Sequence, residues 1–290
     1  IADGHPGYTT RRWAEAQALP VETAWHHHAH ASALAGEVGR PGHWLVFAWD
    51  GVGLGEDGTL WGGEALFGKA GRWRRVASLR PFRPPGGDRA GREPWRSAVA
   101  LLWDAGMEWP GDPDSIEIAR QAWQRDINSP QTSAAGRLFD AAAALVLGRT
   151  QVSYEAEGPM VLEAACQQVR EGRSLPLERD ASGTWRSDWR PMLTMLTDAT
   201  LGMAERAERF HATMAQIIVD QAKQIAAEQT FERIGLTGGV FQNRVLAEQC
   251  VQQLEAAGFH VELPTALPCN DAGLSFGQAV EFAARHNEES

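Results

Sequence analysis

Four histidines fall within the five positions from His26 to His30, and this cluster constrains the chain more than any other feature. The surrounding residues 22–35 are good helix formers. On a helix, His26 and His30 lie one turn apart on the same face, and two imidazoles at that spacing can bind one divalent metal ion. His27 and His28 would then point elsewhere. The alternative is a group of core or surface histidines that bind no ligand.

Two imidazoles leave a first-row metal short of ligands, and carboxylates on loop tips would complete the site. Asp50 and Asp271 are the candidates. Each also has a simpler interpretation, because Asp50 could contact a phosphate-bound magnesium ion or form a turn. Asp271 could cap the helix predicted at 274–282. The histidines therefore carry the prediction of one metal site, which is also the predicted catalytic centre.

The chain is predicted to be an α/β protein, because short apolar segments alternate with longer segments of helical period. A loop is predicted at 81–94, and a boundary between two lobes near residue 125, giving lobes 1–125 and 126–290. The predicted strands are 45–49, 59–64, 234–236 and 260–263, with a glycine-rich turn at 51–58. The predicted helices are 95–103, 116–126, 136–147, 204–228 and 242–257.

A strand, two glycines and a helix follow one another around Gly238 and Gly239. This order is typical of a nucleotide cradle, because bare backbone at a helix N-terminus can approach a phosphate closely. The Asn243 amide could hydrogen-bond a base or ribose. The simpler interpretation is a strand-to-helix turn in which glycine permits positive φ. Gly51 and Gly53 give a weaker signal, since Asp-Gly also occurs in hairpin turns.

Composition excludes several classes of protein. The formal charge is −10, the pI is near 5.4, and the only lysines are Lys69 and Lys223, which disfavours autonomous binding to nucleic acid. The longest apolar runs, 45–49 and 141–147, fall short of the ~20 residues that cross a bilayer, so no membrane association is expected. The 43% hydrophobic content supports a large core.

Three separate cysteines without a CxxC pair fit a reducing cytoplasm. We expect Cys166 and Cys250 to be packed thiols on apolar helix faces, and Cys269 adjoins the proposed ligand Asp271. The sequence begins at Ile1 without an initiator Met, so we expect it to be a piece of a longer protein.

Taken together and in order, several segments resemble the carboxyl-terminal domain of HypF, the carbamoyltransferase of nickel-iron hydrogenase maturation. The resemblance covers nearly the whole chain. The same fold serves tRNA threonylcarbamoyl-transfer proteins and antibiotic O-carbamoyltransferases. The segments that carry the resemblance are 3–14, 26–30, 50–64, 132–140, 153–155, 237–243 and 270–271.

The resemblance implies a two-lobed actin- and hexokinase-like fold, of ribonuclease H-like type, with a nucleotide in the cleft. It implies iron or zinc at His26, His30, Asp50 and Asp271. The nucleotide would be ATP, ADP, AMP or carbamoyl adenylate, bound with or without Mg²⁺. Matching positions imply nucleotide contacts from Gly51, Gly53, Gly136, Asp140, Gly158, Gly238, Gly239, Asn243 and Asn270.

The implied reaction is carbamoyl transfer from carbamoyl adenylate to the C-terminal cysteine of HypE. An adenylate-forming domain of the same polypeptide would make the donor from carbamoyl phosphate and ATP. Two copies of the chain could also form a homodimer. The chain departs from the family at Val161, where relatives often carry an acid that contacts ribose, and in lacking a strand hairpin ahead of Asp3. The alternatives are O-carbamoylation of a small-molecule hydroxyl, and a nucleotide-binding lobe without catalysis.

Overall fold

The structure, a computed structural model, describes residues 1–109 and 113–286. It confirms an α/β protein, with helices on both faces of a mixed sheet. The strands are β1 (Ala2–Asp3), β2 (Thr23–Ala24), β3 (Trp44–Leu54), β4 (Leu60–Gly68), β5 (Arg74–Leu79), β6 (Leu177–Arg179), β7 (Trp185–Ser187), β8 (Arg233–Thr237) and β9 (Val261–Glu262). The α-helices are α1 (Thr9–Glu15), α2 (His26–Val38), α3 (Trp95–Asp104), α4 (Pro113–Gln124), α5 (Ala135–Leu147), α6 (Glu157–Ala164), α7 (Met192–Thr197), α8 (Met203–Ala226), α9 (Arg244–Ala256) and α10 (Leu274–His286), and the 3-10 helices are η1 (Gly87–Gly91), η2 (Gly239–Gln242) and η3 (Asp271–Gly273).

Seven strands form one sheet in the order β6-β7-β5-β4-β3-β8-β9. β3, β4 and β5 are antiparallel neighbours, whereas β8 runs parallel to β3. The parallel pairing of β3 with β8 ends at the pair Ala48 and Thr237. Asp50 and Gly238 therefore lie just beyond the last paired residues of two neighbouring strands, on the side of the sheet where the carboxyl end of β8 lies.

Residues 44–49 of β3 are buried on both faces, which explains their uninterrupted apolar sequence. Its odd-numbered side chains pack in the larger core with residues of α5 and α8, whereas the even-numbered ones pack with residues of α2. Trp44 and Trp49, on opposite faces, are almost fully buried. Replacing either Trp by Ala would lower the stability of the fold by about 3–5 kcal/mol. Packing of this strength holds β3, and the residues at its end, in place.

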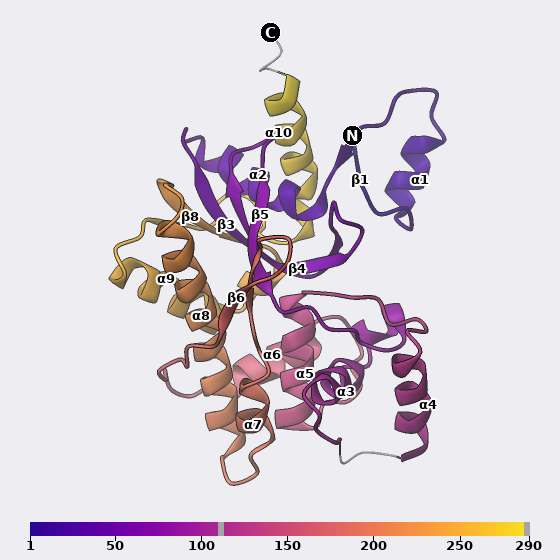
Figure 1. Ribbon diagram of the computed structural model, residues 1–290. Coiled ribbons are helices and arrows are strands. Elements are labelled where there is room, and N and C mark those ends of the chain that lie inside the picture. Colours follow the sequence, from indigo (N-terminus) through magenta and orange to yellow (C-terminus); the bar gives the residue numbers. More distant parts are fainter. Residues whose placement is uncertain (110–112, 287–290) are drawn as a thin grey trace.

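The histidine helix α2 ends where Gly39 adopts a φ of 63° and its N–H donates to the carbonyl of Ala35. Helix α10 lies against α2 (Figure 1). Gly277 makes this approach possible, because a Cβ there would lie 1.9 Å from the carbonyl oxygen of Ala29. Ser32 of α2 donates a hydrogen bond to buried Glu281 of α10. The two contacts, one near the start of α10 and one in its second half, hold this helix against α2, and Asp271 lies just before its first residue.

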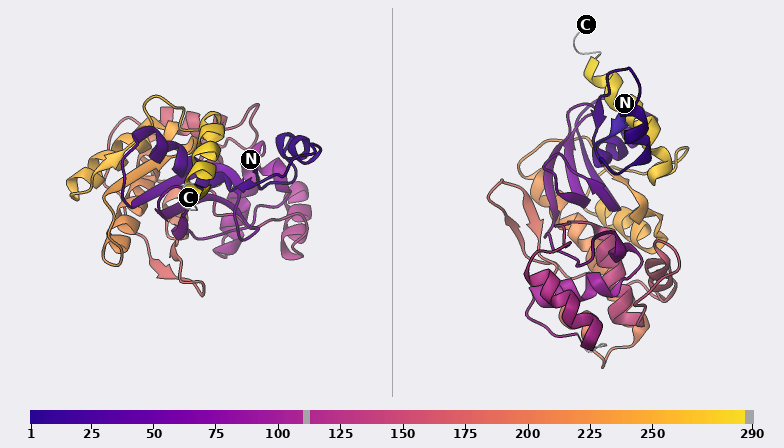
Figure 2. Two further views of the ribbon diagram at one scale, coloured as in Figure 1. Left: turned by 90° about the horizontal axis from the view of Figure 1, so that it is seen from above. Right: turned by 90° about the vertical axis from the view of Figure 1, so that its right-hand side faces the viewer.

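Several of the other helices form a second group, away from α2 and α10. Figure 1 shows α3, α5, α6 and α7 gathered at the end of the molecule opposite the carboxyl terminus, and the side view in Figure 2 shows the same division. The lobe boundary near residue 125 stays a prediction. β8 and β9 lie after that position in the sequence, yet they belong to the same sheet as β3, which lies before it. Within the described residues, every helix is too short or too polar to span a bilayer.

Three local predictions need correction. The turn placed at 51–58 is shorter, because β3 continues to Leu54 through a register shift between Trp49 and Gly53. The chain reverses at Gly55, whose N–H donates to the carbonyl of Thr59. The predicted loop 81–94 contains η1. Cys166 follows the end of α6 rather than lying on a helix face, whereas Cys250 is buried in α9 as expected.

Candidate metal centre and nucleotide cleft

Four side chains predicted as ligands come together at one point. One ligand atom each from His26, His30, Asp50 and Asp271 can be chosen so that all lie within 4.8 Å of one another. Nε2 of His26 lies 3.1 Å from Asp50 Oδ2 and 3.5 Å from Asp271 Oδ1. Nε2 of His30 lies 3.4 Å from each of the same two oxygens. Two nitrogens and two carboxylate oxygens thus face one small volume.

Three elements supply this cluster. The two histidines lie one turn apart at the start of α2, Asp50 lies at the register shift in β3, and Asp271 begins η3. Gly53 lets β3 pass directly over the helix, because a Cβ there would lie 2.5 Å from Cδ2 of His26. The Asp271 side chain is 63% exposed, whereas the histidine side chains are buried. The cluster is therefore open to solvent on the Asp271 side.

The carboxylates and imidazoles of the cluster shift one another's pKa values. Burial by itself lowers the pKa of His26, but hydrogen bonds to Asp271, Asp3 and Asp50 outweigh it and raise the pKa well above its usual value. Similar contacts raise the pKa of His30. Burial would raise the pKa of Asp50, yet both histidines hold it well below its usual range. The carboxylates therefore favour the protonated form of both imidazoles.

Asp3 belongs to this centre, and residue-by-residue reasoning missed it. Its Oδ2 lies 2.9 Å from Nδ1 of His26, and its Oδ1 accepts a hydrogen bond from the His5 backbone N–H. Asp3 is buried in β1, which pairs with β2 immediately before α2. Carboxylates commonly orient metal-binding histidines in this way. The one available signal was that Asp3 lies in segment 3–14 of the family resemblance.

His27 and His28 point away from the cluster, as predicted. Both are buried, and neither nitrogen of His27 has a hydrogen-bond partner in the described residues. Burial lowers the pKa of His27 well below its usual value and that of His28 to about 4. Both rings lie near Trp61, with centroids about 6 Å away. They are neutral packing residues at neutral pH.

The cluster fits a metal ion by its donor chemistry. Nε2 of His30 is buried and has no hydrogen-bond partner among the described residues, although two carboxylate oxygens face it. Imidazole nitrogen and carboxylate oxygen together suit iron or zinc. Asp50 is held at its other oxygen, since Oδ1 accepts a hydrogen bond of 3.2 Å from the Gly239 N–H. The four residues could thus hold an ion with little rearrangement.

The predicted glycine turn adjoins this cluster. Gly238 follows β8 with a φ of 99°, and a Cβ there would lie 2.2 Å from the carbonyl oxygen of Trp49. A Cβ on Gly239 would lie 2.8 Å from Asp50 Oδ1 and 3.9 Å from the Cβ of Asn270. Only glycine permits this closeness. The turn brings backbone N–H groups beside the candidate ligand Asp50, where a phosphate could approach both.

Helix α5 also lies close to the chain beside Asp50. A Cβ on Gly136 would lie 2.8 Å from Cα of Gly51, so the helix touches the chain next to Asp50. Asp140, one turn further along, is buried, and burial raises its pKa to about 6 although Arg137 pulls it down. Gly158 lies apart from Gly51, in α6, where a Cβ would lie 3.1 Å from that of Ala143.

The two predicted amide residues have structural hydrogen bonds. Asn243 caps α9 by accepting a hydrogen bond from the Leu246 N–H, which orients its Nδ2 toward Nε2 of His211 at 2.9 Å. One N–H of that amide is left for another partner. Asn270 accepts from the Ala272 N–H at the start of η3. Both therefore hold the turns that lead into α9 and η3, whatever else they bind.

Glu64 is a further buried acid that the sequence analysis did not select. Its Oε2 accepts hydrogen bonds from the Gly62 and Gly63 N–H groups, at 2.5 and 2.6 Å, and its Oε1 accepts one from the Ser133 hydroxyl. Burial raises its pKa to about 7. Ser133 lies two residues before α5, so Glu64 connects β4 to the segment that leads into the helix that carries Gly136. Its place within the apolar stretch of β4 gave no sign of this role, and the one available signal was that Glu64 ends segment 50–64 of the family resemblance.

Comparison with known proteins places these features in a family. Residues 46–278 match the family model described as "Carbamoyltransferase, Kae1-like Domain, second subdomain", and residues 1–37 match the "HypF Kae1-like domain". The chain is 37% identical to carbamoyltransferase HypF of Rhizobium leguminosarum bv. viciae, over 95% of this chain and 37% of that protein. It is 33% identical to a carbamoyltransferase HypF homolog of Cupriavidus necator, over 96% of this chain and 75% of that protein.

A solved structure shows the same architecture. The crystal structure of full-length HypF in the phosphate- and nucleotide-bound form aligns with 99% of this chain at a TM-score of 0.91 and 29% identity. The predicted two-lobed, actin- and hexokinase-like fold is thereby confirmed. The chain spans 39% of that structure's length.

Proposed function

The chain belongs to the HypF carbamoyltransferase family, and from this premise we propose that it transfers a carbamoyl group from carbamoyl adenylate to a thiol. The observation that carries the proposal is the convergence of His26, His30, Asp50 and Asp271 beside the Gly238 turn. That arrangement puts candidate metal ligands next to backbone donors for a phosphate. We propose that the nucleotide occupies the cleft between this turn and α5.

The cluster residues would hold one ion, iron or zinc. When bound, the ion would supply Lewis-acid stabilisation of the charge that develops on oxygen as AMP leaves. The chain's own groups would do the rest. The Gly239 N–H, which donates to Asp50 Oδ1, is placed to donate to a phosphate oxygen instead.

The attacking thiol would come from the acceptor. Burial raises the pKa of Cys166 to about 12 and raises the pKa of both Cys250 and Cys269, so none of these thiols readily forms a thiolate. In the proposed step, the acceptor thiol gives its proton to solvent, and its sulfur bonds to the carbamoyl carbon. The bond from that carbon to the phosphate oxygen breaks, and AMP departs with the electron pair.

The acceptor that we propose is the C-terminal cysteine of HypE, and the product would lead to the cyanide ligands of a nickel-iron hydrogenase. We further propose that an adenylate-forming domain of the same polypeptide supplies the donor from carbamoyl phosphate and ATP. The family membership supports both steps. The net charge of −10 supports a protein rather than a nucleic-acid partner.

The test is incubation of the chain with carbamoyl adenylate and a synthetic HypE tail peptide that ends in cysteine. Mass spectrometry should detect a carbamoyl group on the peptide sulfur. The double variant His26→Ala, His30→Ala should lose this transfer. The control His260→Ala, whose ring is 62% exposed and pairs with Glu262 at the surface, should retain it.

The remaining outcomes separate the alternatives. Transfer that is unchanged in the double histidine variant would refute a catalytic role for the metal cluster. A modified hydroxyl compound with no modified peptide would identify a small-molecule O-carbamoyltransferase. Nucleotide binding without transfer to either acceptor would identify a lobe that binds but does not catalyse.

A further inference from the structure

We propose that the pocket beside Gly51 binds the free carboxylate at the end of the acceptor peptide, with Arg137 and Arg92 as its recognition groups. This inference rests on the proposed function, because a carboxylate site is useful there only if the acceptor group sits at a chain terminus. It assigns a substrate-binding role to residues that the metal and nucleotide sites do not use.

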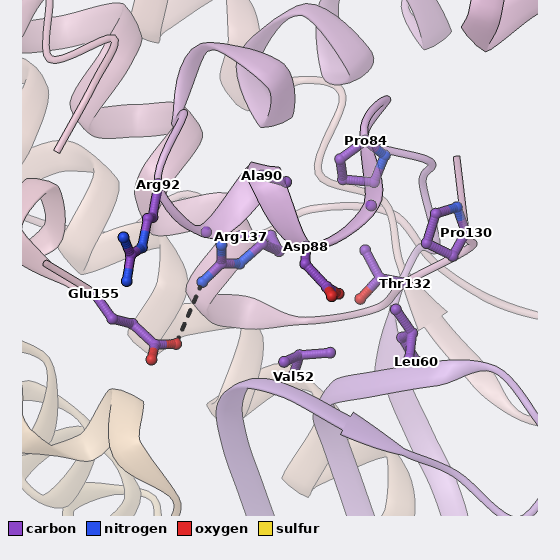
Figure 3. Close-up of a pocket in the computed structure, with 12 residues that line it drawn as sticks. Val52, Leu60, Pro84, Asp88, Ala90, Arg92, Pro130, Thr132, Arg137 and Glu155 are labelled. Carbon is purple, nitrogen blue, oxygen red and sulfur yellow. Dashed lines mark ion pairs between the residues drawn. The ribbon is translucent and has the colours of Figure 1, made fainter. Parts of the chain in front are cut away.

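The pocket has a volume of about 310 Å³ and lies between η1, the start of α5 and the end of β3. Figure 3 shows Arg92, Arg137 and Glu155 on one side of it, with Val52 and Leu60 along the bottom and Pro84 and Pro130 on the other side. One end is therefore charged and the other apolar. The carboxyl terminus of a peptide would fit this arrangement, with its carboxylate at the charged end and its preceding side chains at the apolar end.

Arg137 is the main recognition group, because it is buried yet incompletely paired. Its side chain is 10% exposed, and its Nε has no hydrogen-bond partner among the described residues. Nη1 lies 3.1 Å from buried Asp140, which holds one end of the guanidinium in place. A buried, fixed guanidinium with a free donor is suited to a carboxylate, which it can bind through two parallel hydrogen bonds.

Glu155 occupies the position that the acceptor carboxylate would take. Its Oε1 lies 3.8 Å from Nη2 of Arg137, a distance too long for a hydrogen bond, and its side chain is 74% exposed. An exposed side chain held by so weak a contact can swing aside at little cost. Glu155 thus shows that this side of Arg137 attracts a carboxylate, and it should compete with the ligand.

The pocket also lies in the right place for a terminal cysteine. A Cβ on Gly51 would lie 3.1 Å from Glu155 Oε1 and 3.5 Å from Arg137 Nη2, and Gly51 directly follows Asp50 of the metal cluster. In a C-terminal cysteine only Cα and Cβ separate the sulfur from the carboxyl carbon. A carboxylate held by Arg137 would therefore keep the thiol close to the cluster.

The charges of the pocket favour a carboxylate over a phosphate. Asp88 and Glu155 line it together with the two arginines, so a ligand with two negative charges would meet more repulsion than a ligand with one. Figure 3 shows the Asp88 carboxylate directed toward the Thr132 hydroxyl, across the pocket from Arg92. An acid and a hydroxyl at that side could accept and donate hydrogen bonds to the peptide backbone of the acceptor.

Binding is the first test and needs no donor. Calorimetry would compare a short peptide ending in cysteine with a free carboxylate against the same peptide with a C-terminal amide. Because a hydrogen bond to a charged group stabilises a complex by enough to change affinity about tenfold or more, the free acid should bind at least about tenfold more tightly. Inorganic phosphate should compete with the free acid only weakly. Equal affinity for acid and amide, or strong competition by phosphate, would overturn the proposal.

Variants locate the effect. Arg137→Lys keeps the charge but removes the planar fork, and should abolish the preference for the free acid. Arg92→Gln and Glu155→Gln alter exposed side chains and so keep the test independent of folding. The first should weaken binding of the free acid, and the second should strengthen it severalfold by removing the competing carboxylate. Neither should change the affinity for the amide. A Glu155→Gln variant with unchanged affinity for the acid would contradict the competition.

Transfer kinetics separate this inference from the proposed function. If the amide peptide is carbamoylated as efficiently as the free acid, the function stands and the carboxylate site is wrong. If no peptide is carbamoylated but the acid still binds in a way that depends on Arg137, the pocket stands and the function is wrong. If both are correct, the amide should raise KM with little effect on kcat.

Discussion

Oδ2 of Asp3 lies 2.9 Å from Nδ1 of His26, on the opposite side of the ring from the Nε2 that faces Asp50. This relationship determines what His26 can bind. When Nδ1 donates its hydrogen to Asp3, the lone pair of Nε2 points into the cluster, which is the tautomer that a metal ligand needs. A strand at the beginning of the chain thereby orients a helix residue more than 20 positions away.

Asp3→Asn should weaken metal binding by about tenfold or more, because loss of such a supporting carboxylate typically costs that much. The substitution keeps the size of the side chain, so the fold should persist. Competition with a chelator of known affinity would measure the change. The control Asp180→Asn removes an acid that also accepts backbone hydrogen bonds, but in the β6–β7 hairpin. Equal affinities in the two variants would refute the orienting role.

Metal affinity should rise with pH through the neutral range. His26 and His30 have pKa values raised by their carboxylate neighbours, and each must lose its extra proton before its nitrogen can bind an ion. Below those pKa values the proton competes with the metal. Calorimetry in buffers of different ionisation enthalpy should show protons released on binding at about pH 7. Binding without proton release would contradict the raised pKa values of the two histidines.

Gly136→Ala should damage the nucleotide cleft although alanine favours helices. The change would normally stabilise a helix by about 1 kcal/mol, but here the new Cβ would lie 2.8 Å from Cα of Gly51. Overpacking of this kind typically costs about 1–3 kcal/mol, and it would push α5 from the chain beside Asp50. We expect adenine nucleotides to bind about tenfold more weakly. Equilibrium dialysis would measure this.

The matched control for that variant is Gly202→Ala. Gly202 precedes α8 with a φ of −64°, and a Cβ there would meet nothing within 4 Å. Its nucleotide affinity should equal that of the unchanged chain. If the two glycine variants bind nucleotide alike, close contact between α5 and Gly51 is not needed for binding.

Glu64→Gln should change how stability depends on pH. Burial raises the pKa of Glu64 to about 7 from its usual 4.5, so the folded state favours the protonated carboxyl. The stability that this preference contributes is complete below about pH 4.5 and is lost as the pH rises through about 7. The loss is ~3 kcal/mol for a shift of this size. Glutamine should remove that part of the pH dependence, because it cannot ionise and can still bond Ser133.

Urea unfolding at about pH 5 and about pH 8 would test this. The unchanged chain should lose more free energy of unfolding between the two conditions than the Glu64→Gln variant does. Other buried groups titrate identically in both proteins, so the difference isolates Glu64. Parallel changes in the two proteins would show that Glu64 is ionised at both pH values.

Local spacing explains which predictions were accurate. The strand at 45–49 and the helix at 136–147 follow from apolar runs and helix formers, and the structure has both. Helical spacing predicted only the pairing of His26 with His30, whereas Asp50 was expected to join them because two imidazoles leave a metal short of ligands and because the family resemblance implies it. The errors lie where tertiary contacts prevail. β3 passes its expected end because β4 continues to pair with it beyond the register shift at Asp50.

The sequence by itself determined the period of the histidines, the apolar strand before Asp50 and the glycines on either side of the cleft. These depend on neighbours a few positions apart, whose relations are set by backbone geometry. Only the tertiary structure decided that Asp3 supports His26 and that Glu64 connects β4 to the start of α5. It also decided that Arg137 lies buried beside Gly51, with an Nε that has no hydrogen-bond partner in the part of the chain that the structure describes. Such contacts join residues far apart in the chain, and their formation depends on how whole elements pack, which no local pattern encodes.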